Sequence, residues 1–159
     1  MKKIKFKTEE LHNAFLILSS AKYTKMSDAD KIKVCKIALA LKPISVKFED
    51  DNKSVAETLK PKDGDFEATY AKVQEFERLL RIGGDMSKAP MGAAEHFAFI
   101  NDVWNPYNKL VAEAIKPMAD AEVELEIEPL SEEAFGQLMA SNDNWVIDTV
   151  VSLAEIITE

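Results

Sequence analysis

The chain has 159 residues, of which 47% are hydrophobic and 30% charged, a balance typical of a globular domain and not of a disordered chain. Its net charge of −8 and the lack of a long apolar run disfavour nonspecific nucleic-acid binding and a membrane span. A single cysteine excludes an internal disulfide, and the charged first residues, 1–7, lack the apolar core of a signal peptide. We therefore expect one domain over residues 1–159, located in the cytoplasm.

The first predicted element is a strand over residues 3–7, in which lysines alternate with Ile4 and Phe6. Strict alternation is the pattern of a strand with one buried face and one exposed face. Thr8, followed by two glutamates, predicts a helix cap and a helix over about residues 9–21.

A long helix is predicted over residues 28–60, with Ser27 as its N-cap and Asp30 near its third position. Apolar residues recur at helical spacing on both sides of Pro43. We therefore expect one helix that continues through the proline with a kink.

Two further helical segments follow a turn that ends at Gly64. Asp65 is predicted to cap the first of them, and Gly83 and Gly84 to end it. In the second, the spacing predicts that Phe97 and Trp104 point inward, and Asn105–Pro106 is either a kink or a fresh helix start.

The second strand is predicted over residues 122–128, where glutamates alternate with apolar side chains. Between Asp120 and Glu133 there are seven acidic residues and no basic one. Pairing with residues 3–7 would place lysines opposite glutamates and stack the apolar residues on the other face. We favour an antiparallel pairing. Ser131 then predicts a cap for a short helix.

A last helix is expected to bury a stripe of Val146, Val150, Leu153 and Ile157. The predicted fold class is mainly α with a small β element. Helical hairpins form a bundle closed by a two-stranded ribbon that pairs residues 3–7 with residues 122–128. Because such a ribbon is unstable alone, its apolar face must lie on helices.

No motif predicts a catalytic residue, a metal site or a cofactor. His12 and His96 are expected at the surface or the edge of the core, and Glu9 with His12 has the spacing of a di-iron ligand pair but no second copy. Cys35 lies in the long helix, where a small buried hydrophobe is the default. The acidic run at residues 49–51 lacks the alternating ligands of a calcium loop, so we interpret it as a solvated face.

Aromatic residues near helix breaks supply the candidate partner interface. Trp104 and Tyr107 flank the Asn-Pro pair, Phe99 lies on a different helix face from Phe97, and Trp145 opens the last helix. Tryptophan and tyrosine are enriched among the residues that dominate binding energy at protein interfaces.

The two ends of the chain have a similar pattern, in which a charged alternating strand leads into a helix. A lysine-rich strand runs into Thr8-Glu9-Glu10-Leu11, and the alternating glutamate strand runs into Pro-Leu-Ser-Glu-Glu-Ala-Phe135. This pattern resembles the small uncharacterised proteins of tailed-phage and prophage genomes. The resemblance implies a viral origin, expression in a bacterial cytoplasm with association to the virion as one location, and a role as assembly accessory, virion component or modulator of a host factor.

Three functional hypotheses follow. The leading one is a non-enzymatic protein that binds a protein partner, either a host or phage protein or a second copy in a homo-oligomer, without contacting nucleic acid or membrane. The second is a small enzyme or ligand-binding protein with a site between helices near Pro43 or Pro106. The third is an acidic mimic of nucleic acid built on residues 120–133, which direct pairing with the lysines of residues 3–7 would undo.

Overall fold

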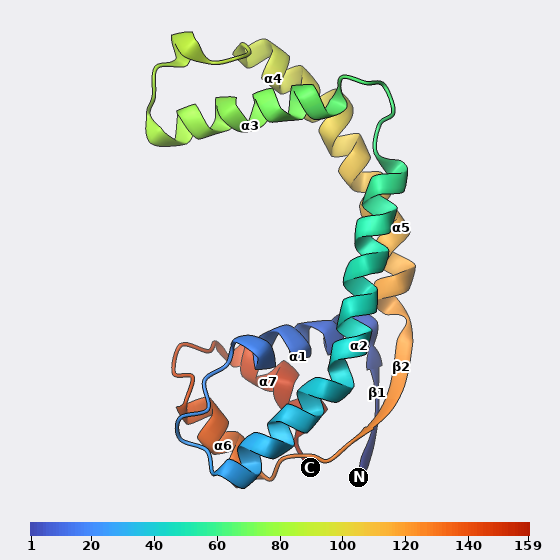
Figure 1. Ribbon diagram of the computed structural model, residues 1–159, viewed down its shortest axis with the longest axis vertical. Coiled ribbons are helices and arrows are strands. Elements are labelled where there is room, and N and C mark those ends of the chain that lie inside the picture. The colour runs from blue at the N-terminus through green and yellow to red at the C-terminus, as the bar shows by residue number, and fades with distance from the viewer. The chain divides into compact units, whose positions relative to one another are not determined.

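The computed structural model describes residues 1–159 (Figure 1). The strands are β1 (Lys2–Lys7) and β2 (Glu122–Ile127), and the helices are α1 (Thr8–Ser20), α2 (Asp28–Leu59), α3 (Phe66–Ile82), the 3-10 helix η1 (Met86–Lys88), α4 (Ala93–Phe99), the π-helix η2 (Ile100–Trp104), α5 (Asn105–Asp120), α6 (Glu132–Ala140) and α7 (Ile147–Ile157). The predicted class, mainly α with a small β ribbon, is confirmed. No helix combines the length and the apolar character that crossing a membrane requires.

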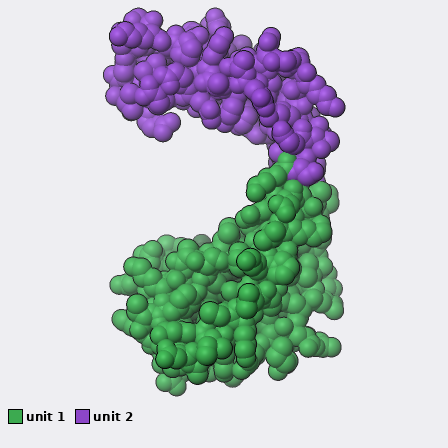
Figure 2. Space-filling view, viewed as in Figure 1, with its two compact units in different colours: residues 1–53, 116–159 green, residues 54–115 purple.

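The chain forms two compact units (Figure 2). Unit 1 comprises residues 1–53 and 116–159, and unit 2 comprises residues 54–115. Each unit has a hydrophobic core of its own. The single domain expected over residues 1–159 stays a prediction.

The ribbon forms in the predicted way. β1 and β2 are antiparallel, and Lys3, Lys5 and Lys7 lie opposite Glu126, Glu124 and Glu122. The apolar face of the ribbon packs on the helices of unit 1, so that Ile4 and Ile127 are almost fully buried. The alternation of charge and burial thus sets both the partner and the register.

The ion pairs of the ribbon run partly along its diagonals. They join the lysines of β1 to carboxylates of β2 and of the last residue of α5: Lys3 to Glu126 at 3.6 Å, Lys5 to Glu122 at 2.7 Å and Lys7 to Asp120 at 2.9 Å. A nucleic-acid mimic needs unpaired carboxylates spaced like phosphates. These contacts therefore count against the third functional hypothesis.

The contact between Lys7 and Asp120 predicts a pH dependence. The hydrogen bond and the charge of Lys7 hold the pKa of the Asp120 carboxyl below its ordinary value of 3.8. Because the pKa is lower in the folded state, the contact stabilises the fold above about pH 4, and this contribution is lost as the pH falls further. Lys7→Met should lower the urea midpoint at neutral pH and flatten its decline below pH ~4.

The matched control is Lys42→Met, because Lys42 is exposed in α2. Urea midpoints followed by circular dichroism across the acid range measure both variants. Parallel curves for the wild type and Lys7→Met would show that the ion pair contributes nothing to folding. The effect should be small, since both partners are exposed to solvent and screened by salt.

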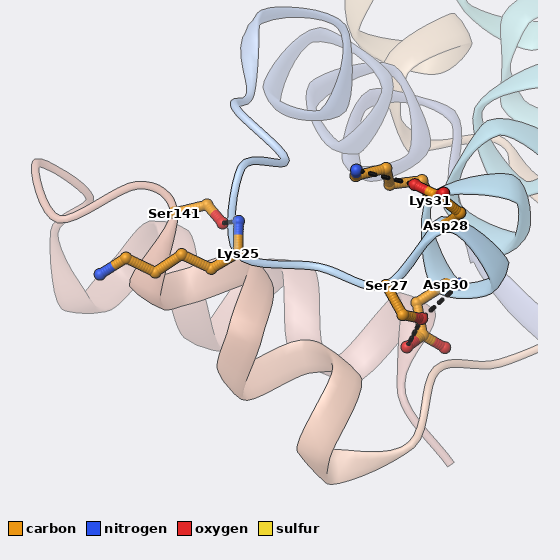
Figure 3. A network of polar contacts seen from close by, with 6 residues as sticks. All are labelled: Lys25, Ser27, Asp28, Asp30, Lys31 and Ser141. Atoms are coloured by element: carbon orange, nitrogen blue, oxygen red, sulfur yellow. Dashed lines mark hydrogen bonds and ion pairs between the residues drawn. The ribbon is translucent and has the colours of Figure 1, made fainter.

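Two predicted helix caps are confirmed. The Ser27 hydroxyl accepts a hydrogen bond from the Asp30 backbone N–H at 3.1 Å and donates one to the Asp30 carboxylate at 2.6 Å (Figure 3). The Ser131 hydroxyl accepts from the Ala134 N–H at 3.2 Å. Both hydroxyls satisfy backbone donors that the first helical turn leaves unpaired.

The predicted cap at Thr8 is wrong. The N-cap position belongs to Lys7, and Thr8 is already the first residue of α1. The Thr8 backbone N–H and hydroxyl both donate to the Ala121 carbonyl at 2.8 Å, which extends the ribbon by one step. Glu10 supplies the cap from inside the helix, since its carboxylate accepts from the Lys7 N–H at 2.8 Å.

α2 continues through Pro43, as predicted. The prediction that Cys35 is buried is wrong, because its side chain is exposed. The buried stripe of this part of α2 consists of Val34, Ile37 and Leu41. Cys35 is one residue away from Val34, and a step of about 100° around the helix moves it off the stripe.

The end of α6 is tied to the loop between α1 and α2. The side chain of Asn142, only 5% exposed, accepts from the Lys22 N–H and donates to the carbonyls of Lys22 and Leu138, all within 2.8–2.9 Å. The Ser141 hydroxyl accepts from the Lys25 N–H at 3.0 Å (Figure 3). Two side chains thereby satisfy backbone groups of a loop that has no regular partner of its own.

The expected burial of Val146 is also wrong. Val146 precedes α7 as its N-cap residue and is 64% exposed. Leu153, Ile156 and Ile157 carry the buried face of this helix. The helix starts one residue later than its apolar pattern suggests, and the side chains of its first turn project into solvent.

Candidate protein-interaction surface

The π-helix η2 decides which aromatic side chains of unit 2 face inward. Its hydrogen bonds span five residues, so Phe99 and Trp104, five positions apart, share one face. Pro106 lies two residues beyond the end of η2 and has no N–H to donate to the preceding turn. Asn105 has helical dihedrals, so the helix continues through it. Asn105 is therefore not the cap of a new helix that starts at Pro106.

The predicted inward position of Phe97 is wrong, because the π-helix changes which residues of this segment share a face. Phe97 was expected inside, yet its side chain is 70% exposed, whereas Phe99 is 7% exposed and belongs to the core of unit 2. Of these two phenylalanines, Phe97 is therefore the one that faces solvent. A regular α-helix would have placed Phe97 and Trp104, seven positions apart, on the same face.

Aromatic rings of α3 and of the η2–α5 segment pack together. Tyr70 stacks on Trp104 with ring centroids 4.6 Å apart and an interplanar angle of 13°. Phe66 lies beneath them, 5.8 Å from Phe99 and 5.5 Å from Tyr107, with its ring edge-on to the tyrosine. Offset stacked and edge-to-face geometries are the favourable ones for aromatic pairs.

These rings line an open groove of about 380 Å³. Its lining residues come from the residue after α2, from α3 and from the η2–α5 segment: Lys60, Phe66, Glu67, Tyr70, Ala71, Gln74, Trp104 and Tyr107. We call it the aromatic groove. Tyr70, Trp104 and Tyr107 are half-buried, so part of each ring remains accessible from the groove.

Polar contacts fix the edge of the aromatic groove. The Tyr107 hydroxyl donates to the Ala56 carbonyl at 2.7 Å. Lys60 and Glu67 form an ion pair, whose hydrogen bond raises the pKa of Lys60 and lowers the pKa of Glu67. The pKa of Glu67 is thus shifted in the direction opposite to the raised pKa that would mark a buried carboxylate in a site of the second hypothesis.

Comparison with protein-family models, with curated proteins and with solved structures finds no match to this chain. Its function is therefore inferred from its own surfaces.

Three of the four predicted interface residues belong to one cluster. Trp104 and Tyr107 line the aromatic groove, and Phe99 supports it from the core. Trp145 lies in unit 1, half-buried against the core of that unit. Their contact with a partner stays a prediction.

Sequence reasoning missed the part played by Phe66 and Tyr70. Their helical spacing predicted a buried face of α3, but nothing in that spacing identified the aromatic side chains on the other wall of the groove.

The two histidines are at the core edge, as expected. His12 Nδ1 is 2.8 Å from the hydroxyl of Ser45, a residue that is 1% exposed. His96 stacks on Phe76 at 4.6 Å, and its Nε2 is 3.0 Å from the Glu77 carboxylate. No three of the histidine, cysteine, aspartate and glutamate side chains are grouped so as to hold a metal ion.

Proposed function

We propose that this chain is a non-enzymatic protein-interaction protein of phage or prophage type, an assembly accessory, virion component or modulator of a host factor. The observation that supports it is the stacked Tyr70–Trp104 pair, two half-buried rings lining an open groove. Rigid amphipathic rings give large contact areas at a low cost in conformational entropy. The partner is a bacterial or phage protein, or a second copy of this chain.

The rim of the aromatic groove favours a protein ligand. An apolar side chain that enters between Trp104 and Tyr107 would cover the exposed ring surfaces and remove them from water. The ion pair of Lys60 and Glu67 at the rim offers a donor and an acceptor to the backbone of an entering segment. An apolar centre with a polar rim is the common composition of protein interfaces.

The proposal predicts that filling the aromatic groove abolishes partner binding. Ala71 is exposed on α3 and lines the groove, so Ala71→Arg inserts a long side chain without removing core contacts. We expect this variant to lose the partner that the tagged wild type captures from phage-producing bacteria, or to lose the wild type's self-association. Quantitative mass spectrometry of the captured proteins and light scattering of the purified chain measure the two cases.

Ala68→Arg is the matched control. Ala68 is also exposed on α3 but does not line the groove, so the same substitution adds the same charge and volume elsewhere. Circular dichroism should show equal helicity for both variants. Equal capture and equal solution mass for the wild type, Ala68→Arg and Ala71→Arg would overturn the proposal.

A further inference from the structure

A second groove lies in unit 1 between α1 and α7, with a volume of about 500 Å³. Its lining residues are Phe6, Glu10, Asn13, Ala14, Leu16, Ile17, Asp148, Thr149, Ser152, Leu153, Glu155 and Ile156. We call it the acidic groove. Ala14, Leu153 and Ile156 are core residues that form an apolar floor. Leu16 is 44% exposed, and Val151, in the adjoining turn of α7, is 48% exposed.

The charges of this groove are all of one sign. Glu10, Asp148 and Glu155 line it, and no lysine, arginine or histidine does. None of these three carboxylates is in an ion pair, although Glu10 also accepts the hydrogen bond from the Lys7 N–H, whereas Glu122 and Glu126 of the ribbon are each paired with a lysine. An apolar floor between unpaired carboxylates is complementary to an apolar stripe flanked by cations.

We propose that the acidic groove binds an amphipathic helix of a partner protein, with leucine-like side chains on one face and lysine or arginine residues beside it. The walls of the groove are two helices, and a third helix packs between two others by placing its ridges of side chains in their groove. α7 has 11 residues, so at ~1.5 Å per residue it matches about three turns of a docked helix.

The positions of the carboxylates support a partner helix with cations on both sides of its apolar face. Asp148, Ser152 and Glu155 are spaced by four and three residues and therefore lie along one face of α7. Val151 belongs to the same face and adds apolar area beside them. Glu10 faces them from α1, so that a bound helix would have carboxylates on both sides.

A preformed helical probe tests the proposal without knowledge of the partner. The probe is a fluorescein-labelled, hydrocarbon-stapled peptide with a leucine face and flanking lysines, about three turns long. Fluorescence anisotropy should show saturable binding to the wild type that weakens as salt is added. A peptide with glutamates in place of the lysines should not bind.

Two variants with matched controls locate the binding site. Glu155→Lys should weaken binding of the leucine–lysine peptide by about tenfold or more. Asp143→Lys makes the same change of charge in a loop of unit 1 outside the groove and should leave binding unchanged. Leu16→Ala should weaken binding as well, whereas Leu39→Ala, which truncates a leucine 66% exposed on α2, should not.

Each outcome is decisive for the proposal. Loss of binding in the groove variants alone supports it. No binding to the wild type, equal weakening by Glu155→Lys and Asp143→Lys, or equal binding of the leucine–glutamate peptide would overturn it. Glu155→Lys places a cation in the last turn of α7, where positive charge is favourable, so misfolding of this variant is not expected. All of these residues belong to unit 1, so failure here leaves the proposal for the aromatic groove intact.

Discussion

Replacing Leu11 with alanine is expected to lower the free energy of unfolding of unit 1 by about 2–5 kcal/mol. Leu11 is fully buried in α1 and belongs to the core that the ribbon, α2, α6 and α7 share. Truncation removes apolar contacts and leaves a cavity, because close-packed neighbours relax only partly. A loss of this size is a large fraction of the stability of a typical domain.

Leu16→Ala in the same helix is the matched control. Leu16 is 44% exposed, so its truncation should cost less than about 1 kcal/mol. Urea unfolding followed by tryptophan fluorescence measures both variants. In a Trp104→Phe background the remaining tryptophan, Trp145, packs on the core of unit 1 and reports on that unit. Similar losses for the two leucine variants would contradict the assigned core.

Asn142→Ala should have the second-largest effect, a loss of about 2–4 kcal/mol. The substitution removes three hydrogen bonds of a side chain that is 5% exposed, two to the backbone of Lys22 and one to the Leu138 carbonyl, and each such bond contributes about 0.5–1.5 kcal/mol. Thermal and urea unfolding in the same fluorescence background measure this loss.

Asn142→Asp separates the acceptor from the donor. The aspartate keeps an oxygen that accepts from the Lys22 N–H, but its second oxygen replaces the NH2 group that donates to the carbonyls of Lys22 and Leu138. The variant should therefore be less stable than the wild type at neutral pH, where the carboxylate repels these carbonyl oxygens. In acid the protonated carboxyl can donate again, so part of the lost stability should return. Asn144→Ala, at an exposed position of the same loop, should change the stability by no more than about 0.5 kcal/mol. A tolerated Asn142→Ala would show that water replaces the amide.

The ribbon and two of the helix caps were predictable because their signals are local. Lysines and glutamates alternate with apolar residues in two segments of opposite charge, so pairing satisfies both faces at once. Ser27 and Ser131 each precede acidic residues and an apolar helical pattern, and both form the expected cap, whereas Thr8 before the same kind of pattern bonds to the Ala121 carbonyl instead. Pro43 did not interrupt α2, since the apolar rhythm continued on both sides of it.

The role of Asn142 could not be predicted, because its partner is remote in sequence. Ser141–Asn144 has the composition of a turn, and composition favours a cap for the following helix. Instead the amide binds the backbone of Lys22, 120 residues away. A polar side chain buried against a distant loop has no signature in its own segment.

The inward face of α4 was mispredicted because the spacing of the inward-facing residues changes between α4 and η2. The spacing of Phe97 and Trp104 fits an α-helix, while that of Phe99 and Trp104 fits the π-helix that forms. Pro106, two residues beyond this segment, was the available signal, since proline removes a hydrogen bond of the preceding turn and so disturbs a regular helix. The same change of phase brings Trp104 to Tyr70 and so creates the wall of the aromatic groove.

The ribbon has a consequence for synthesis on the ribosome. Lys7 and Asp120 are 113 residues apart in the chain, so at about 5–20 residues per second β1 exists for roughly 6–23 s before β2 is translated. An unpaired strand is a template for aggregation, and lysines along it disfavour wrong pairing. The positive strand of the ribbon is the one made first, and its like charges repel identical strands on neighbouring nascent chains of the same polysome.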